Sequence, residues 1–225
     1  MKRALCGILS LILLGCVPAM AEGPAGHKLL YQGHGSLRVV TAEGKVIYID
    51  PYAGEGYDLG ADLILVSHDH YDHNQVDLIK NRNVGCQIIR WSDALVKGDY
   101  KTFDLGWATV EAVQAGNNRN HDIRSCVGWL ITLSGGVSVY ATGDTSTTDQ
   151  MKELADRDIH YAFFVCDGKY NMDIDEAAAC AKTVGARHSI PYHMAPGALF
   201  DEKKAEKFDV ENRLIVPAGT EITLE

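Results

Sequence analysis

One stretch of the sequence joins an apolar run to a cluster of polar side chains: Leu63-Ile64-Leu65-Val66-Ser67-His68-Asp69-His70-Tyr71-Asp72-His73. The apolar run predicts a strand that is covered on both faces, which is typical of sheets with helices packed outside them. In an extended chain, residues two apart point to the same side, so His68 and His70 can bind one metal ion while Asp69 points away. Asp72 and His73 follow the turn and can face a second ion. Imidazole and carboxylate groups at a strand end are what a divalent metal site requires; a histidine-rich polar loop without a metal is the alternative.

Further extended segments recur along the chain, each bounded by Gly, Pro, Asn or Asp. Beyond residues 63–66, strands are predicted at residues 28–31, 37–40, 46–49, 87–89, 110–113, 127–133, 137–141, 161–165 and 190–192. Helices are predicted at residues 75–80, 149–155 and 175–184, the last with Asp175 as its N-terminal cap. This alternation predicts an α/β fold with two sheet-rich halves that meet near residues 114–126.

Three other candidate ligands, His121, Asp144 and His193, each stand at or just beyond the end of a predicted strand. In layered α/β folds, the loops that leave one edge of the sheets gather into a single cleft, where ligands bind. We therefore expect these three side chains to meet the cluster at residues 68–73.

With these residues in place, the sequence resembles the metallo-β-lactamase superfamily over nearly all of residues 28–218. Besides the H-x-H-x-D-H pattern at residues 68–73, the resemblance rests on Gly33-His34-Gly35-Ser36, Ile49-Asp50-Pro51, Tyr140-Ala141-Thr142-Gly143-Asp144-Thr145 and Ile190-Pro191-Tyr192-His193. The pattern looks most like the branch that contains ascorbate-6-phosphate lactonase and the phosphodiesterase of N-acyl ethanolamine phospholipids. The resemblance implies a four-layer αβ/βα sandwich made of two related halves.

The resemblance also implies a ligand set for two metal ions. The first ion would be held by His68, His70 and His121, the second by Asp72, His73 and His193, with Asp144 bridging them. Zinc is the expected metal because imidazole and carboxylate ligands suit it, and the same ligands accept manganese or iron.

This centre predicts hydrolysis. A metal lowers the pKa of its bound water to near neutrality, so a hydroxide nucleophile is available, and the ions polarise the bond that it attacks. Asp72 is the candidate catalytic residue, which would orient the water and carry its proton to the leaving group. The expected substrate is a small molecule with an ester, lactone, amide or phosphoester bond. An iron-dependent redox enzyme of the same fold and a non-catalytic metal-binding protein are the alternatives.

Four further residues are candidates for supporting roles. Asp50 is interpreted as a carboxylate that orients a ligand histidine, the alternative being an ordinary Asp-Pro turn. The resemblance places His34 near the mouth of the cleft, although the polarity of a hairpin turn explains it as well. Tyr170 and Asn171 follow a predicted strand and are expected to line the substrate pocket, unless they belong to an ordinary loop.

The first residues are typical of a signal peptide. Lys2 and Arg3 precede an apolar stretch, and residues 19–21 form a small-x-small cleavage pattern, which predicts cleavage after Ala21. The apolar stretch is shorter than the roughly 20 residues of a spanning helix. We expect a periplasmic or secreted protein whose single domain covers residues 22–225, with a lipoprotein anchored at Cys16 as the alternative.

Net charge and cysteine spacing bear on the possible partners, disulfides and redox motifs of the protein. The formal charge is -9, and loss of the two leader cations makes it more negative, which argues against nucleic acid as a partner. Export would allow a disulfide among Cys86, Cys126, Cys166 and Cys180, but the sequence does not indicate a pairing. None of these cysteines forms a C-x-x-C pair, so a redox motif is not predicted. The sequence does not indicate an oligomeric state.

Overall fold

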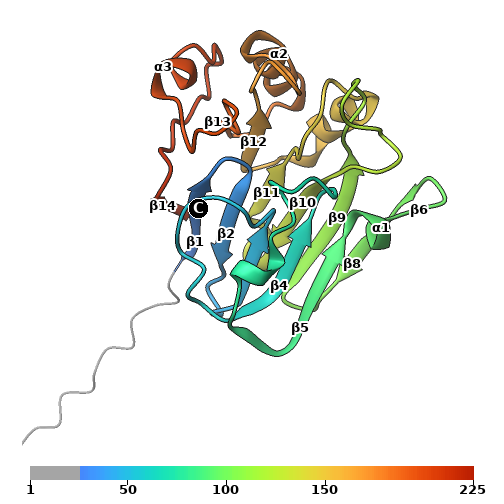
Figure 1. The fold of residues 1–225 in the computed structure, drawn as a ribbon, viewed down its shortest axis with the longest axis vertical. Helices are drawn as coiled ribbons and strands as arrows, with labels where there is room; N and C mark the ends of the chain where they lie inside the picture. Colours follow the sequence, from blue (N-terminus) through green and yellow to red (C-terminus); the bar gives the residue numbers. More distant parts are fainter. Residues whose placement is uncertain (1–25) are drawn as a thin grey trace, which may run out of the picture.

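The computed structural model describes residues 26–225 (Figure 1). The predicted leader, residues 1–21, and its Cys16 therefore lie outside the described residues.

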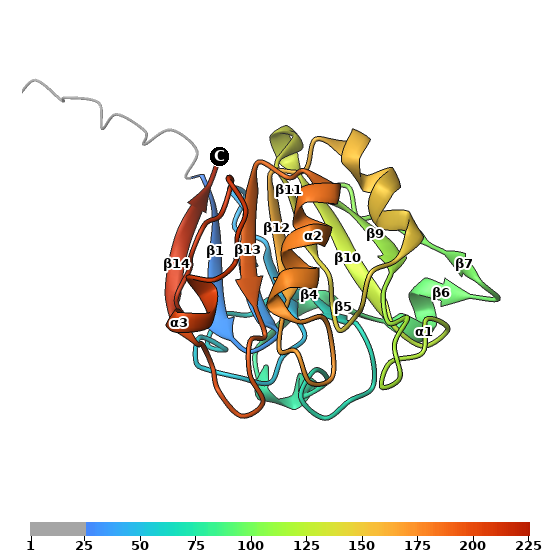
Figure 2. The ribbon, with the colours of Figure 1, turned by 90° about the horizontal axis from the view of Figure 1, so that it is seen from above.

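Two mixed sheets of six strands each form the centre of the fold. The first sheet contains, in spatial order, β14 (Thr220–Leu224), β1 (His27–Gly33), β2 (Ser36–Val40), β3 (Val46–Ile49), β4 (Ala61–Val66) and β5 (Arg82–Arg90). The second contains β13 (His188–Tyr192), β12 (Tyr161–Val165), β11 (Ser138–Ala141), β10 (Val127–Leu133), β9 (Ala108–Gln114) and β8 (Thr102–Asp104). A separate hairpin of β6 (Leu95–Val96) and β7 (Asp99–Tyr100) projects at one side (Figure 2).

The two sheets have the same mixture of strand directions. In the first sheet, β3, β4 and β5 run parallel, and in the second β11, β12 and β13 do. All predicted strands are present, so the α/β class is confirmed. The weakly patterned strands β6, β7, β8 and β14 were not predicted.

The alternation of side chains along β3 and β4 explains the layers. Ile47 and Leu65 belong to the core between the sheets, whereas Tyr48 and Ile64 belong to a smaller cluster on the outer face of the first sheet. Successive side chains of a strand point to opposite faces, so an unbroken apolar strand fills both layers. The prediction that the run at residues 63–66 is buried on both faces is confirmed.

Helical segments complete the outer layers. These are α1 (Trp91–Ala94), α2 (Ile174–Val184), α3 (Glu202–Ala205) and the 3-10 turns η1 (Val76–Leu78), η2 (Ser134–Gly136) and η3 (Asp149–Arg157). Figure 2 shows α2 and η3 outside the second sheet, where α2 packs on β12 and η3 on β9. On the outer face of the first sheet, the smaller cluster is covered by loop residues such as Tyr57 and Leu59 and by Val76 of η1. The four-layer sandwich is confirmed.

Three expectations were wrong in detail. The predicted helix at residues 75–80 is only the turn η1; none of the residues of η1 is fully buried, although Val76 and the following Ile79 pack against the outer cluster of the first sheet. The predicted helix at residues 149–155 is the 3-10 turn η3. Asp173, not Asp175, caps α2, because its side chain accepts hydrogen bonds from the backbone N–H groups of Asp175 and Glu176.

The boundary between the halves is also not at residues 114–126. That segment connects β9 and β10, which pair with each other inside the second sheet. The chain passes from one sheet to the other between β5 and β8, and β14 then returns to pair with β1 in the first sheet. A polar loop rich in Gly and Asn looks like a boundary in sequence, but here it carries part of the site.

Two further findings concern the described residues. None of their helices is long and apolar enough to span a membrane. All four of their cysteines are free thiols, and Cys126, Cys166 and Cys180 are buried. The structure therefore contains no disulfide among these four cysteines.

Candidate metal centre

The seven candidate ligands lie together at one edge of the two sheets, in the loops that follow β4, β9, β11 and β13. These loops leave the carboxyl ends of strands that run side by side, as a cleft at a sheet edge requires. Asp69 and His70 are both exposed, and His70 differs from Asp69 in that its Nδ1 lies 3.1 Å from His121 Nε2.

The first cluster contains His68, His70 and His121. Their ligand nitrogens all lie within 4.8 Å of one another, and His121 Nε2 is 3.1 Å from His70 Nδ1. Burial lowers the pKa values of His68 and His70 below their ordinary value, which favours the neutral imidazole that binds metals. The Nε2 atom of His68 is buried without a hydrogen-bond partner. Because an unpaired buried polar atom is costly, this convergence of lone pairs fits a cation.

The second cluster contains His73 and His193, whose Nε2 atoms are 3.3 Å apart, together with Asp72 and His34. Burial lowers the pKa of His193 to about 4. Burial alone would lower the pKa of His73 too, but the carboxylates of Asp144 and Asp50 raise it to about 9. Cation binding at His73 in the metal-free protein would therefore displace a proton near neutral pH.

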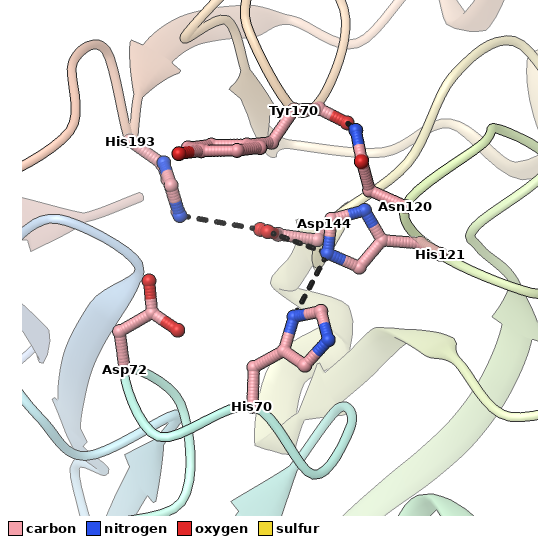
Figure 3. A pocket seen from close by; sticks show the side chains of 7 residues that line it. All are labelled: His70, Asp72, Asn120, His121, Asp144, Tyr170 and His193. Carbon is pink, nitrogen blue, oxygen red and sulfur yellow. Dashed lines mark hydrogen bonds and ion pairs between the residues drawn. The ribbon is translucent and has the colours of Figure 1, made fainter.

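Asp144 lies between the two clusters, with His121 and His193 on either side of it in Figure 3. Its Oδ2 is 3.2 Å from His121 Nε2, and its Oδ1 is 3.3 Å from His73 Nε2 and 3.4 Å from His193 Nε2. Burial would raise the pKa of Asp144, but the neighbouring His193 and His73 hold it well below its usual range. One carboxylate oxygen therefore faces each cluster, as a bridging ligand requires.

Asp50 supports the second cluster from beneath. It accepts hydrogen bonds from the backbone N–H of Ser67 at 2.7 Å and from Ser67 Oγ at 2.6 Å, and its Oδ2 is 2.9 Å from His73 Nδ1. A carboxylate on the second ring nitrogen fixes the tautomer and orientation of a ligand histidine. The contact with His73 is the one expected of a carboxylate that orients a ligand histidine. An ordinary Asp-Pro turn would not require this contact.

We expect Asp50→Asn to lower metal affinity at the second cluster by about 10-fold to 100-fold, because the neutral amide orients His73 less strongly. Metal content after dialysis against graded metal buffers measures this loss. Asp69→Asn is the matched control, since Asp69 is exposed within the same motif. Equal metal retention by both variants would contradict the orienting role.

His34 is placed deeper than a cleft-mouth residue would be. It lies in the turn between β1 and β2 and is only 4% exposed. Its Nε2 is 3.0 Å from Asp72 Oδ2, and its ring centroid is 3.6 Å from that of His193. Burial would raise the pKa of Asp72, but the hydrogen bond from His34 and the charge of His73 lower it below its usual range. His34 therefore holds Asp72 as a carboxylate beside the second cluster.

Gly35 provides the space for His73. A Cβ atom at this position would lie 2.8 Å from His73 Cε1, closer than van der Waals contact allows. We expect Gly35→Ala to displace the His73 ring and to reduce metal binding at the second cluster, measured as ions retained per chain. Gly60→Ala is the matched control, because its Cβ would make a similarly close contact, 2.5 Å from Asn83 Oδ1, at the opposite end of β4 from the metal centre. Full retention by Gly35→Ala would show that the ring position does not matter.

A cavity of about 430 Å³ opens above the two clusters. Its lining residues are His70, Asp72, Asn120, His121, Asp144, Tyr170 and His193. Figure 3 shows the Tyr170 ring lying across the cavity above Asp144. Tyr170 thus lines the cavity as expected.

Asn171 is not among the lining residues, contrary to the expectation for it. Its Nδ2 donates to Asp144 Oδ2 at 2.8 Å and to Asp167 Oδ2 at 2.7 Å. It contacts Asp144 through the amide because the loop after β12 turns this side chain toward the buried carboxylates.

Two residues of the site were missed from the sequence. Asp167 is buried and accepts hydrogen bonds from the backbone N–H groups of Lys169 and Tyr170, which fixes the loop that carries Tyr170. Asn120 donates to the backbone oxygen of Tyr170 at 3.0 Å. The position of Asp167 just beyond a predicted strand, like that of Asp144, was the available signal. Asn120 is one of several Asn residues in its loop and gave no signal.

Comparisons with known proteins show the family to which the chain belongs. Residues 28–193 match the model of the Beta-lactamase superfamily domain. A metal-dependent hydrolase of Methanosphaera stadtmanae is 28% identical over 219 residues, covering 84% of this chain and 93% of that protein. Another, of Anaeromyxobacter dehalogenans, is 27% identical over 212 residues, covering 78% of this chain and 77% of that protein.

A crystal structure from Parabacteroides distasonis, described as a metal-dependent hydrolase, superposes with a TM-score of 0.70 at 25% identity. It covers 85% of this chain and 93% of that chain. The predicted enzyme class, a metal-dependent hydrolase with a His/Asp cluster able to bind metal, is confirmed at this level. The protein belongs to the β-lactamase superfamily, and its fold is the one predicted for the metallo-β-lactamase type.

Proposed function

We propose that the protein is a dinuclear metal hydrolase that cleaves an ester, lactone, amide or phosphoester bond of a small molecule. The observation that carries the proposal is the placement of Asp144 between two ligand clusters, with one carboxylate oxygen toward each. Both clusters face a cavity of about 430 Å³, which suits a small substrate. The resemblance to the branch that contains ascorbate-6-phosphate lactonase supports the choice of bonds.

The residues fit two divalent ions, with zinc as the proposed metal and manganese or iron as the other candidates. When bound, such ions supply an activated water and polarise the bond to be cleaved. His68, His70 and His121 would hold one ion. Asp72, His73 and His193 would hold the other, and Asp144 would hold both.

Asp72 has the position of a proton carrier. It lines the cavity, and His34 engages its Oδ2. Its lowered pKa keeps it as a carboxylate, which orients the attacking water by accepting a hydrogen bond from it. Because its pKa is lowered, Asp72 would hold a proton from the water only transiently and would pass it to the leaving group as the scissile bond breaks.

Metal analysis and a substrate panel test the proposal. We expect two zinc ions per chain and chelator-sensitive hydrolysis of at least one member of a panel of p-nitrophenyl esters, lactones and phosphodiesters. Iron in the purified protein with no turnover on the panel would favour the iron-dependent redox enzyme. Bound metal with no turnover of any kind would favour a non-catalytic metal-binding protein.

We also propose that the protein is exported, on the basis of residues 1–21. Expression of the full chain in a bacterial host is expected to yield a periplasmic or secreted protein that begins at Glu22, as measured by mass spectrometry. A lipid-modified N-terminus at Cys16 would show the lipoprotein alternative instead. An intact Met1 in the cytoplasmic fraction would contradict export.

A further inference from the structure

A second cavity, of about 250 Å³, lies next to the metal centre. It is lined by Tyr52, Ala53, Gly197, Ala198, Leu199 and His34. Apart from His34, these residues offer no ionisable side chain except the weakly acidic Tyr52 phenol. The cavity is therefore suited to an apolar group.

His34 stands between this cavity and the larger one, which share no lining residue. Its Nε2 is 3.0 Å from Asp72 Oδ2, and its ring lies against that of His193. Asp72 and His193 both line the larger cavity. A ligand whose reactive bond lies beside Asp72 would therefore reach the smaller cavity by crossing the side chains of Asp72 and His34.

Hydrogen bonds to the turn at residues 33–36 hold both walls of the smaller cavity in place. On one wall, the Leu199 backbone oxygen accepts from His34 N at 2.9 Å and from the Tyr31 hydroxyl at 3.1 Å. On the other, Ser36 Oγ accepts from the backbone N–H groups of Tyr52 and Ala53, each at 3.1 Å. The cavity is therefore preformed, and little conformational freedom is lost when a ligand enters.

The apolar character extends to the surrounding surface. Leu199 is 49% exposed, and Tyr71, whose ring packs edge-on against that of Tyr52, is 72% exposed. These are among the few large hydrophobic side chains that are exposed in the described residues. Apolar surface beside a cleft gains free energy when a ligand removes it from water.

We propose that this cavity binds the apolar acyl or aryl group of the substrate, so that the preferred substrates are uncharged esters, lactones or amides with a medium-sized apolar acyl part. This proposal rests on the proposed function. At about 30 Å³ per water-sized group, the cavity holds roughly eight such groups. It therefore fits a chain near hexanoate or octanoate in length.

A series of p-nitrophenyl esters from acetate to decanoate tests the proposal on the metal-loaded enzyme. We expect kcat/KM to rise by about fourfold per added methylene up to hexanoate or octanoate, the value that corresponds to one buried methylene. Beyond that length it should level off or fall. Equal kcat/KM values along the series would overturn the proposal while leaving the proposed function intact.

Leu199→Asn places a polar group in the wall of the cavity and should reduce the ratio of octanoate to acetate kcat/KM at least about fourfold. The matched control is Leu78→Asn, because Leu78 is also an exposed leucine but lines neither cavity. An equal ratio in the two variants would overturn the assignment of the cavity.

Calorimetric titration with octan-1-ol and ethanol tests the cavity without turnover, because neither alcohol contains a bond that the proposed function would cleave. We expect the wild-type protein to bind octan-1-ol more tightly than ethanol and Leu199→Asn to lose that difference. Absence of hydrolysis by the metal-loaded protein would refute the proposed function, whereas absence of a chain-length preference in binding would refute the cavity assignment.

Discussion

Asp144→Ala is expected to lower kcat/KM by more than about 100-fold and to reduce the metal content of the protein. Loss of a residue that only orients a ligand typically costs 10-fold to 100-fold, and Asp144 would bind both ions directly. The buried carboxylate also compensates the charge of the cations, so its removal leaves two clusters of ligands with no anion between them. Elemental analysis of the dialysed protein and kinetics on the best panel substrate measure both effects.

Asp149→Ala is the control for this variant, since Asp149 is an acidic residue of the same connection between β11 and β12 and its side chain is 98% exposed. Its metal content and kinetics should match those of the wild type. If Asp144→Ala kept its metals and its hydrolytic activity, the assignment of Asp144 as the bridge between two ions would be wrong.

Removal of the metals should destabilise the fold as well as abolish activity. A ligand present at 100 times its Kd stabilises the native state by about 2.7 kcal/mol, and two bound ions stabilise it further. For a domain of this size, about 2.7 kcal/mol corresponds to a Tm lowered by roughly 5–10 °C. Thermal unfolding before and after treatment with a chelator measures the shift, and added zinc should restore the original Tm.

This destabilisation has a local cause in the structure. Without cations, His68 Nε2 would stay buried without a hydrogen-bond partner. A Tm unchanged by complete metal removal would mean that the two clusters are held by the fold alone. That result would indicate that the metal binds weakly and contributes little to the free energy of folding.

The predictable part of the fold came from short-range patterns. The run at residues 63–66 and the strand at residues 161–165 are apolar over their whole length, the strand at residues 127–133 is apolar except for Thr132, and all three form as predicted. Burial of a strand on both faces can be predicted from its own apolar residues, without knowing which strands lie beside it. The segment at residues 75–80 also has apolar residues at helical spacing, and Val76 and Ile79 pack against the outer cluster, but only the three-residue turn η1 forms.

The site residues also divide into those that a short-range sequence pattern indicates and those that only tertiary contacts bring together. The spacing of His68 and His70 was the signal that grouped them, and they lie in one cluster, although residues 67–70 form bends rather than a continuation of β4. The contact of His34 with Asp72 and the interaction of Asn171 with Asp144 depend on which loops come together at the sheet edge. No spacing in the sequence encodes those distances.

The sequence by itself therefore determined the apolar strands, the family and the residues able to bind metal, because these follow from side-chain chemistry and local periodicity. Only the tertiary structure decided that β14 pairs with β1, that Asp167 and Asn120 fix the Tyr170 loop, and that an apolar cavity lies beside Asp72. Each of these depends on contacts between segments far apart in the chain. These contacts are stabilised by packing and hydrogen bonds that form only when the two sheets pack together.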